Sequence, residues 1–239
     1  MKNRIYLHPI PVRVWHWINA VCFIVLITTG IQIRYPELVN FFSFKTAMHI
    51  HGWVGFVLIA NYLIWFVFYI LTGKIRIYIP TLNPKKLVRE ILRQVYYYGY
   101  GIFIGNPNPH QPVPDNKFNP LQKVIYFFIM VFLLPAQLIT GLLLWDPKLF
   151  SRRIDILGGI MIVHTIHVVL FSFFAAFIFV HIYLATLGHT ALTHIKAMLT
   201  GYEECEEGLA SESSDLWEER EETGSPIKRP LSREKTSPA

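Results

Sequence analysis

The chain has 239 residues, of which 53% are hydrophobic and only 16% are charged, and its formal net charge is +6. Soluble domains carry about a quarter charged residues, so this composition favours a membrane protein over a soluble enzyme. The positive charge is spread over loops that flank apolar runs, which argues against nucleic acid as a partner. Cys22 and Cys205 form no CxxC or CxxCH motif, which excludes covalent haem attachment and a cysteine-ligated cluster.

Four apolar runs follow one another along the chain and predict membrane-spanning helices, each long enough for a hydrocarbon core of about 30 Å. The basic head, residues 1–16, contains two prolines that discourage a long helix, and we expect no cleavable signal peptide there. Pro135 predicts a kink in the third run. The runs cover approximately residues 17–33, 48–71, 124–145 and 159–187.

The loop between the second and third runs carries its own helical pattern. Between Pro84 and Tyr98, the side chains of Leu87, Ile91, Val95 and Tyr98 share one face, and basic residues lie elsewhere. We therefore predict an all-α fold, a four-helix up-and-down transmembrane bundle with an interfacial helix in this loop. A helix in an ordinary soluble loop is the alternative.

The distribution of charge along the chain predicts its orientation and its domain boundary. Ten lysines and arginines lie in the head and the middle loop, against five in the two other loops. By the positive-inside rule the N- and C-termini are expected to be cytoplasmic. We place the transmembrane domain at residues 1–202. The tail, residues 203–239, is polar and rich in serine and proline, and we expect it to be disordered.

Two histidines on the fourth run, His167 and His181, lie fourteen residues apart. On an α-helix this spacing is about 21 Å of rise and four turns less about 40°, so both imidazoles project from nearly the same face. His16 matches the predicted depth of His181, and His51 matches that of His167. Imidazole is a good iron ligand, and two depth-matched pairs are typical of two stacked b-type haems with both axial positions filled.

Other histidines compete for these roles. His49 lies 200° from His51 around the helix, so only one of the two can face the bundle interior. His164 lies about 100° from the face of His181, against about 40° for His167, and it remains an alternative ligand. A further alternative is a haem-free membrane protein in which the histidines only hydrogen bond between helices.

Four segments together resemble the dihaem cytochrome b subunits of bacterial respiratory complexes. They are R-x-x-H-W at Arg13–Trp17, H-G-W-x-G at His51–Gly55, the histidine spacing of the fourth run, and G-H-T-x-L-x-H-x-K-A-M-L-T-G at Gly188–Gly201. This family comprises the membrane subunits of formate dehydrogenases, thiosulfate reductases and nickel–iron hydrogenases, and includes cytochrome b561-like chains. The resemblance implies that His16 and His181 bind the cytoplasmic-side haem, and His51 and His167 the outer-side haem.

The resemblance also implies a quinone site and protein partners. Asn119 occupies the position of a quinone-binding asparagine, although relatives have glycine where this chain has Leu121. An N-cap for the third span, with Pro120 at the first helical position, is the alternative role of Asn119. Arg13, Arg34 and Lys45 are candidates to pair with haem propionates or to anchor the spans at the interface.

The expected function is transmembrane electron transfer through two b haems in the bacterial inner membrane. Electrons would pass between an iron–sulfur subunit and the quinone pool, menaquinone or ubiquinone. A molybdenum or nickel–iron partner subunit would supply the substrate chemistry, and this chain would have no catalytic residue of its own apart from quinone redox. A free-standing, quinol-oxidising cytochrome of the b561 type is the alternative.

Overall fold

The computed structural model describes residues 2–110, 116–187 and 192–206. These residues form two compact units. The first contains residues 2–4, 77–125 and 204–206 of the described part, and the second contains residues 5–76 and 126–203.

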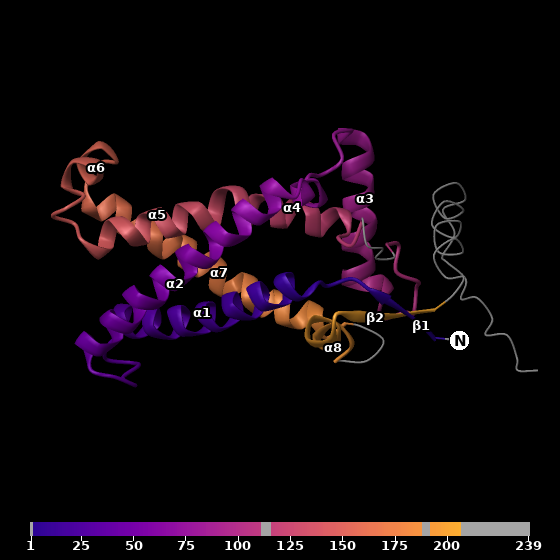
Figure 1. Ribbon diagram of the computed structural model, residues 1–239, viewed down its shortest axis with the longest axis horizontal. Coiled ribbons are helices and arrows are strands. Elements are labelled where there is room, and N and C mark those ends of the chain that lie inside the picture. Colours follow the sequence, from indigo (N-terminus) through magenta and orange to yellow (C-terminus); the bar gives the residue numbers. More distant parts are fainter. Residues whose placement is uncertain (1, 111–115, 188–191, 207–239) are drawn as a thin grey trace, which may run out of the picture. The chain divides into compact units, whose positions relative to one another are not determined.

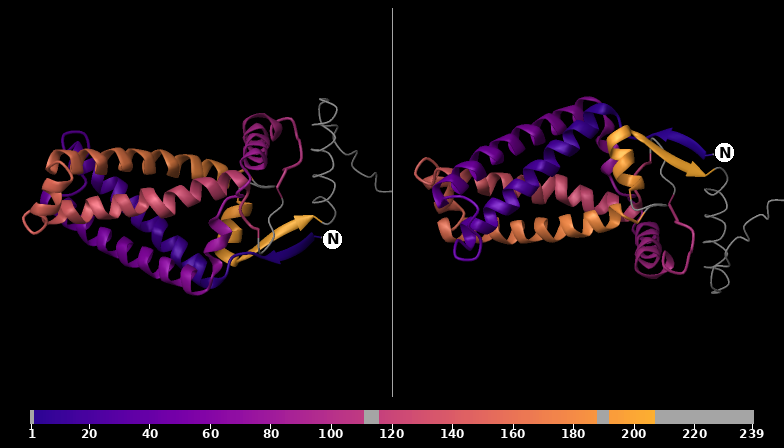
Figure 2. Two further views of the ribbon diagram at one scale, coloured as in Figure 1. Left: turned by 90° about the horizontal axis from the view of Figure 1, so that it is seen from above. Right: turned by 90° about the horizontal axis from the view of Figure 1, so that it is seen from below.

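Four helices within the described residues are long and apolar enough to cross a membrane. They run alternately in opposite directions, and α1 packs beside α2 while α5 packs beside α7 (Figures 1 and 2). The predicted all-α membrane bundle is therefore confirmed. The spans are α1 (Ile10–Arg34), α2 (Phe44–Leu71), the run α4–η3–α5 (Pro120–Phe128, Ile129–Leu133 and Leu134–Trp145) and α7 (Ile160–Ala185).

The first span begins earlier than the sequence pattern predicted, at Ile10 rather than at residue 17. Pro9 is the N-cap residue and Pro11 lies in the first turn. Proline is tolerated there because the first N–H groups of a helix have no intrahelical partner. The two prolines therefore mark the start of this helix instead of excluding it.

Shorter elements complete the chain. A two-stranded sheet pairs β1 (Lys2–Tyr6) with β2 (Tyr202–Glu206), and the sequence pattern predicted neither strand. β2 extends into the predicted tail, of which residues 207–239 lie outside the described part. The remaining elements are η1 (Lys74–Tyr78), α3 (Pro84–Tyr96), η2 (Tyr97–Gly101), α6 (Ser151–Ile156) and α8 (Thr193–Thr200).

The helix predicted in the middle loop is α3, and the side chain of Asn83 caps it by accepting a hydrogen bond from the backbone of Lys86. Its buried face centres on Gln94, which is 1% exposed. Val88, Leu92 and Val95 are exposed, whereas Leu87, Ile91 and Tyr98, which were predicted to share a face with Val95, are half-buried. The exposed apolar stripe beside basic side chains suits a helix that lies on a membrane surface, and that placement stays a prediction.

The second unit has an apolar surface and polar side chains in its interior. Val169 and Phe179 on α7 are 62% and 76% exposed, as expected for side chains that face lipid. Inside, α1 and α2 are joined by two reciprocal hydrogen bonds. Trp15 Nε1 donates to the Asn61 carbonyl at 3.1 Å, and Asn61 Nδ2 donates to the Trp15 carbonyl at 3.2 Å.

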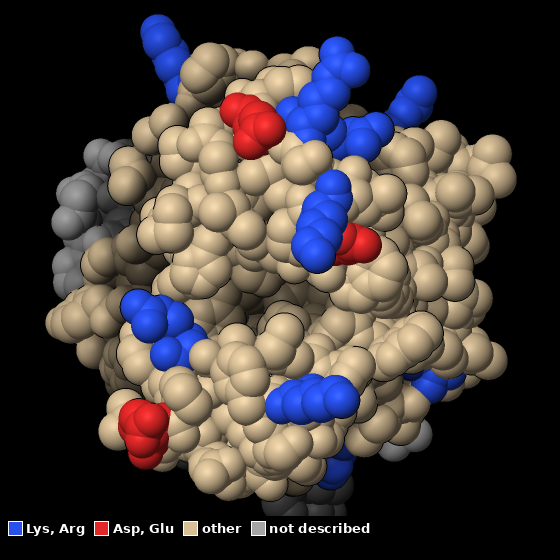
Figure 3. Space-filling view, turned by 90° about the vertical axis from the view of Figure 1, so that its left-hand side faces the viewer, with Lys and Arg blue, Asp and Glu red and all other residues tan. Residues whose placement is uncertain are grey.

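One end of the bundle carries the loops at residues 35–43 and 146–159. Figure 3 looks onto this end and shows lysines and arginines interleaved with acidic side chains around a hollowed, uncharged centre. The mixture of signs is expected from loops in which Glu37, Asp146 and Asp155 accompany the basic residues. No concentrated basic surface is visible on this face.

The third span widens into a π-helical turn over Ile129–Leu133, next to the predicted kink at Pro135. In this register the N–H of Leu134 bonds to the carbonyl of Ile129, five residues back. Pro135 has no N–H to offer the next carbonyl, that of Met130. The hydroxyl of Tyr62 on α2 donates to that carbonyl instead, at 2.9 Å. A tyrosine on a neighbouring span thus satisfies the group that proline leaves open.

We expect the Tyr62→Phe substitution to lower the stability of the protein by about 1–3 kcal/mol, because it leaves the Met130 carbonyl unpaired in the span. Thermal unfolding of the purified protein in detergent measures this change. Tyr183→Phe is the matched control, since Tyr183 is 49% exposed on a span, and it should change stability by less than about 0.5 kcal/mol. Equal losses in the two variants would contradict the role of Tyr62.

Candidate functional site

Two pairs of histidines face one another inside the second unit. The rings of His16 on α1 and His181 on α7 have centroids 6.2 Å apart, and those of His51 on α2 and His167 on α7 are 6.4 Å apart. We call them the 16/181 pair and the 51/167 pair. These are the pairs that depth and helical angle predicted. Since α7 is helical throughout Ile160–Ala185, the two pairs lie at levels separated by about 21 Å of helix rise.

The separation within each pair fits one metal ion between two imidazoles. A first-row metal lies about 2.0–2.1 Å from an imidazole nitrogen. The nitrogens of a five-membered ring with bonds of about 1.3–1.4 Å lie about 1.1 Å from its centre. Two rings on opposite sides of one ion therefore have centroids about 6 Å apart, close to both values in this structure.

Pairs of ligands, rather than larger clusters, characterise this site. Among the described residues there is no group of three or more His, Cys, Asp or Glu side chains arranged to hold a metal ion. A bare metal ion in a protein generally takes three or four protein ligands. Two facing imidazoles instead suit a group that brings its own equatorial ligands, as haem iron does. The residues present therefore fit a haem at each pair.

Threonine hydroxyls contact the other ring nitrogen of both histidines in the 51/167 pair. Thr29 Oγ1 on α1 lies 2.9 Å from His51 Nδ1, and Thr140 Oγ1 on α5 lies 3.0 Å from His167 Nδ1. Both threonines are buried. Gln137 Nε2 lies 3.3 Å from His167 Nε2. The Nδ1 atoms of both histidines thus contact a threonine hydroxyl, and Nε2 of His167 also has a neighbour, the amide of Gln137.

The 16/181 pair has aromatic neighbours instead. Trp17 packs edge-on against His16, with centroids 5.3 Å apart. Phe177, one turn before His181 on α7, stacks on the His181 ring at 5.7 Å. His16 Nδ1 is buried and has no hydrogen-bond partner in the described part of the chain. The two pairs therefore differ in how the second nitrogen of the ring is held.

Glycines permit close approach to the histidines of the 51/167 pair. A Cβ added at Gly141 on α5 would lie 3.1 Å from His167 Cε1, which is tighter than normal packing. A Cβ added at Gly30 on α1 would lie 3.5 Å from His51 Cε1, an ordinary contact. Each glycine directly follows one of the two threonines. Neither of these two glycines was predicted from the sequence to lie near a histidine.

The competing histidines lie away from the pairs. His49 and His164 are both exposed on the outside of their helices. His189 lies outside the described residues. Arg13, a candidate partner for a propionate, donates from its guanidinium to the carbonyl of Leu199. With the bond from Trp17 Nε1 to the Met198 carbonyl at 3.2 Å, this contact ties α1 to α8.

Asn119 lies in the first unit, where it caps the third span. Its Oδ1 accepts from the N–H of Gln122 at 2.8 Å, and Gln122 Oε1 accepts from the N–H of Asn119 at 3.1 Å. This is a capping box, as the alternative role predicted. Asn119 Nδ2 also donates to the hydroxyl of Tyr98 at 3.1 Å. Burial raises the pKa of Tyr98, so this phenol stays protonated at neutral pH.

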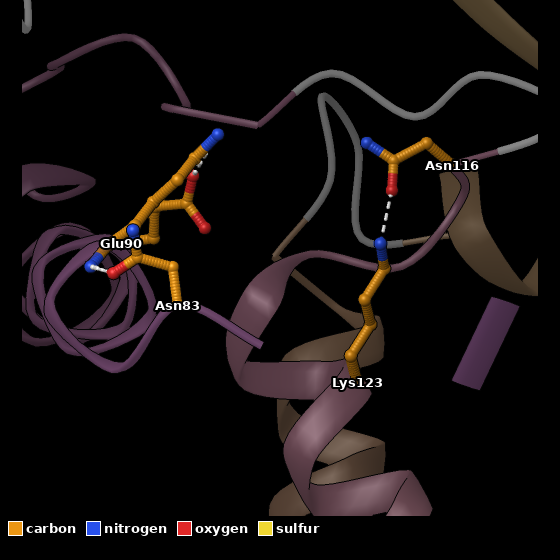
Figure 4. Close-up of polar contacts among 5 residues, drawn as sticks. Asn83, Glu90, Asn116 and Lys123 are labelled. Atoms are coloured by element: carbon orange, nitrogen blue, oxygen red, sulfur yellow. Dashed lines mark hydrogen bonds and ion pairs between the residues drawn. The ribbon is translucent and has the colours of Figure 1, made fainter. Parts of the chain in front are cut away.

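A polar cavity of about 190 Å³ lies in the same unit, lined in part by the residues on either side of Asn119, namely Phe118 and Pro120. Figure 4 shows two of its polar contacts. Lys123 Nζ donates to Asn116 Oδ1 at 2.6 Å, and Lys86 approaches Glu90 at 3.9 Å. His110 also lines this cavity, and burial lowers its pKa, so its imidazole is neutral at neutral pH.

The sequence of this chain matches a known protein family. Residues 7–201 match the family described as "Prokaryotic cytochrome b561". The chain is 32% identical over 202 residues to "Putative cytochrome YdhU" of Escherichia coli K12, covering 84% of this chain and 75% of that protein. It is 27% identical to the "Probable Ni/Fe-hydrogenase B-type cytochrome subunit" of Rhizobium leguminosarum bv. viciae, covering 77% and 81%.

A third relative carries a different description. The chain is 25% identical to the "Putative protein-methionine-sulfoxide reductase subunit YedZ1" of Azospira oryzae, over 84% of this chain and all of that protein. Two of these three names describe a cytochrome, and two mention an enzyme, a nickel–iron hydrogenase in one and a protein-methionine-sulfoxide reductase in the other. The family match covers all four spans and both histidine pairs, and the chain belongs to the prokaryotic cytochrome b561 family.

Proposed function

We propose that this b-type cytochrome is the electron-transfer subunit of a membrane oxidoreductase and holds two b haems. The observation that carries the proposal is the presence of two facing histidine pairs, at two levels of one bundle, each with the ring separation that a single iron requires. When bound, a bis-histidine haem supplies a one-electron couple with no open coordination position. His51 and His167 would hold one haem, and His16 and His181 the other.

The protein's own residues would supply position, orientation and insulation. α7 would fix the spacing between the two sites, since it contributes one ligand to each. The apolar surface of the spans keeps water and ions away from the bundle interior. His49 and His164 are exposed, which supports His51 and His167 as the ligands of their site.

Quinone is the proposed electron partner at the end of the bundle where the third span begins. The amide nitrogen of Asn119 has two donor hydrogens, so it can hold Tyr98 and a quinone carbonyl at once. Reduction of a quinone to a quinol takes up two electrons and two protons. The polar cavity with Glu90, His110 and Lys123 offers groups that can carry protons from the aqueous side.

The other partner is proposed to be an iron–sulfur subunit of a complex whose catalytic subunit carries the substrate reaction. Relatives named as cytochrome subunits of nickel–iron hydrogenase support such an assembly. The excess of basic residues in the head and middle loop supports cytoplasmic N- and C-termini in a bacterial inner membrane. A free-standing, quinol-oxidising cytochrome uses the same ligands and is the second candidate, favoured by relatives that are named only as cytochromes.

The purified protein should contain two b haems per chain, measured by reduced-minus-oxidised spectra and by extraction of haem as the pyridine complex. Substituting His51 or His167 with alanine should remove one haem, and substituting His16 or His181 should remove the other. His49→Ala and His164→Ala are matched controls on the same helices and should retain both haems. A wild-type protein without a b-type α band would overturn the proposal.

Two substitutions of Asn119 separate quinone binding from helix capping. Asn119→Ser keeps an N-cap oxygen but removes the amide, so it should slow reduction of the cytochrome by a quinol analogue while lowering stability less than Asn119→Ala does. Asn119→Ala should also lower stability, by about 1 kcal/mol. Quinol kinetics and thermal unfolding measure the two effects. Normal kinetics in the serine variant would show that Asn119 serves the cap alone.

Affinity purification from mild detergent distinguishes the two candidate functions. A subunit of an oxidoreductase complex should bring down a second chain in fixed stoichiometry, with iron and acid-labile sulfide in the preparation. The complex should lose this chain, and its quinone-reducing activity, when the cytochrome gene is removed. A cytochrome that purifies alone and oxidises quinol with a soluble acceptor would favour the free-standing form.

A further inference from the structure

The two helix pairs of the bundle repeat one local arrangement. In the first pair, Thr29 and Gly30 on α1 contact His51 on α2. In the second pair, Thr140 and Gly141 on α5 contact His167 on α7. The feature that the two pairs share is a threonine hydroxyl at Nδ1 of the histidine.

Each threonine hydroxyl has one hydrogen, and the helix backbone takes it. Thr29 Oγ1 donates to the carbonyl of Val25 at 2.7 Å, and Thr140 Oγ1 donates to the carbonyl of Ala136 at 2.8 Å. In the contact with the imidazole the hydroxyl oxygen must therefore accept, and Nδ1 of the histidine must carry the proton. The opposite nitrogen, Nε2, then bears the lone pair that a metal requires.

We propose that Thr29 and Thr140 are positioning residues that fix the tautomer of His51 and His167 and lower the reduction potential of the haem held there. This inference rests on the proposed haem ligation. A hydrogen-bond acceptor at Nδ1–H makes the imidazole a stronger donor to the metal, which favours the ferric state. Both histidines of the 51/167 pair have such an acceptor at Nδ1. At the 16/181 pair, Nδ1 of His16 has no hydrogen-bond acceptor in the described part of the chain.

Isosteric substitutions test the proposal. Thr29→Val and Thr140→Val keep the shape of the side chain and remove the hydroxyl oxygen, while Thr29→Ser and Thr140→Ser retain it. Thr28→Val and Thr165→Val are matched controls. Thr28 is half-buried and Thr165 is exposed, and each donates to a carbonyl four residues back, Thr28 to Ile24 and Thr165 to Met161.

Redox titration and low-temperature electron paramagnetic resonance of the purified full chain provide the readouts. In each valine variant we expect one of the two haems to become easier to reduce. The expected change is about three- to tenfold in the ratio of reduced to oxidised form at a fixed potential, where tenfold corresponds to 59 mV for one electron. The other haem should keep its potential. The serine variants and the controls should match the wild type.

The outcomes are separable from those of the proposed function. A wild-type protein without two b haems would refute the ligation itself. Two haems in every variant with unchanged potentials would refute only the role of the threonines, as would valine and serine variants that behave alike. Loss of one haem in the valine variant with retention in the serine variant would support positioning, because only the hydroxyl differs.

Discussion

Polar groups inside a membrane have no water to bond, and this constraint shapes the interior of the bundle. The indole of Trp15 and the amide of Asn61 satisfy each other's carbonyls across two spans. Tyr62 satisfies the carbonyl that Pro135 leaves open. Threonines return their hydrogen to their own helix and accept from a histidine on the next one. These polar contacts help to fix which helix faces meet.

The spans could be predicted from sequence because the hydropathy of about twenty consecutive residues does not depend on how the helix packs against other helices. The start of the first span could not be predicted, because a proline disfavours a helix except in its first turn, and the sequence alone did not show that Pro11 lies there. The strands β1 and β2 are separated by almost 200 residues of sequence, so no local pattern links them. The π-helical turn at Ile129–Leu133 is stabilised by Tyr62, which lies far away in sequence.

The histidine pairs could be predicted because helix rise and angle are fixed quantities, and His167 and His181 share one straight helix. Thr29 and Thr140 could not. A threonine in a membrane helix usually bonds only to its own backbone, and the second contact appears when another helix brings a histidine within 3 Å. For Asn119, the sequence supported two roles, quinone binding and helix capping. The structure contains the capping box, which uses the side-chain oxygen of Asn119 and not its amide hydrogens.

α7 contributes one histidine to each pair and thereby determines the separation of the two pairs. Because one continuous helix contributes to both, their spacing is set by its rise and not by how the other spans tilt. Phe174, midway between His167 and His181, is 2% exposed and packs against Phe23 on α1 at 5.4 Å. Aromatic packing therefore fills the level between the pairs and binds α1 to α7 there. The contact lies about two turns from His16 on α1 and about two turns from His181 on α7, and it holds together the two helices that carry this pair.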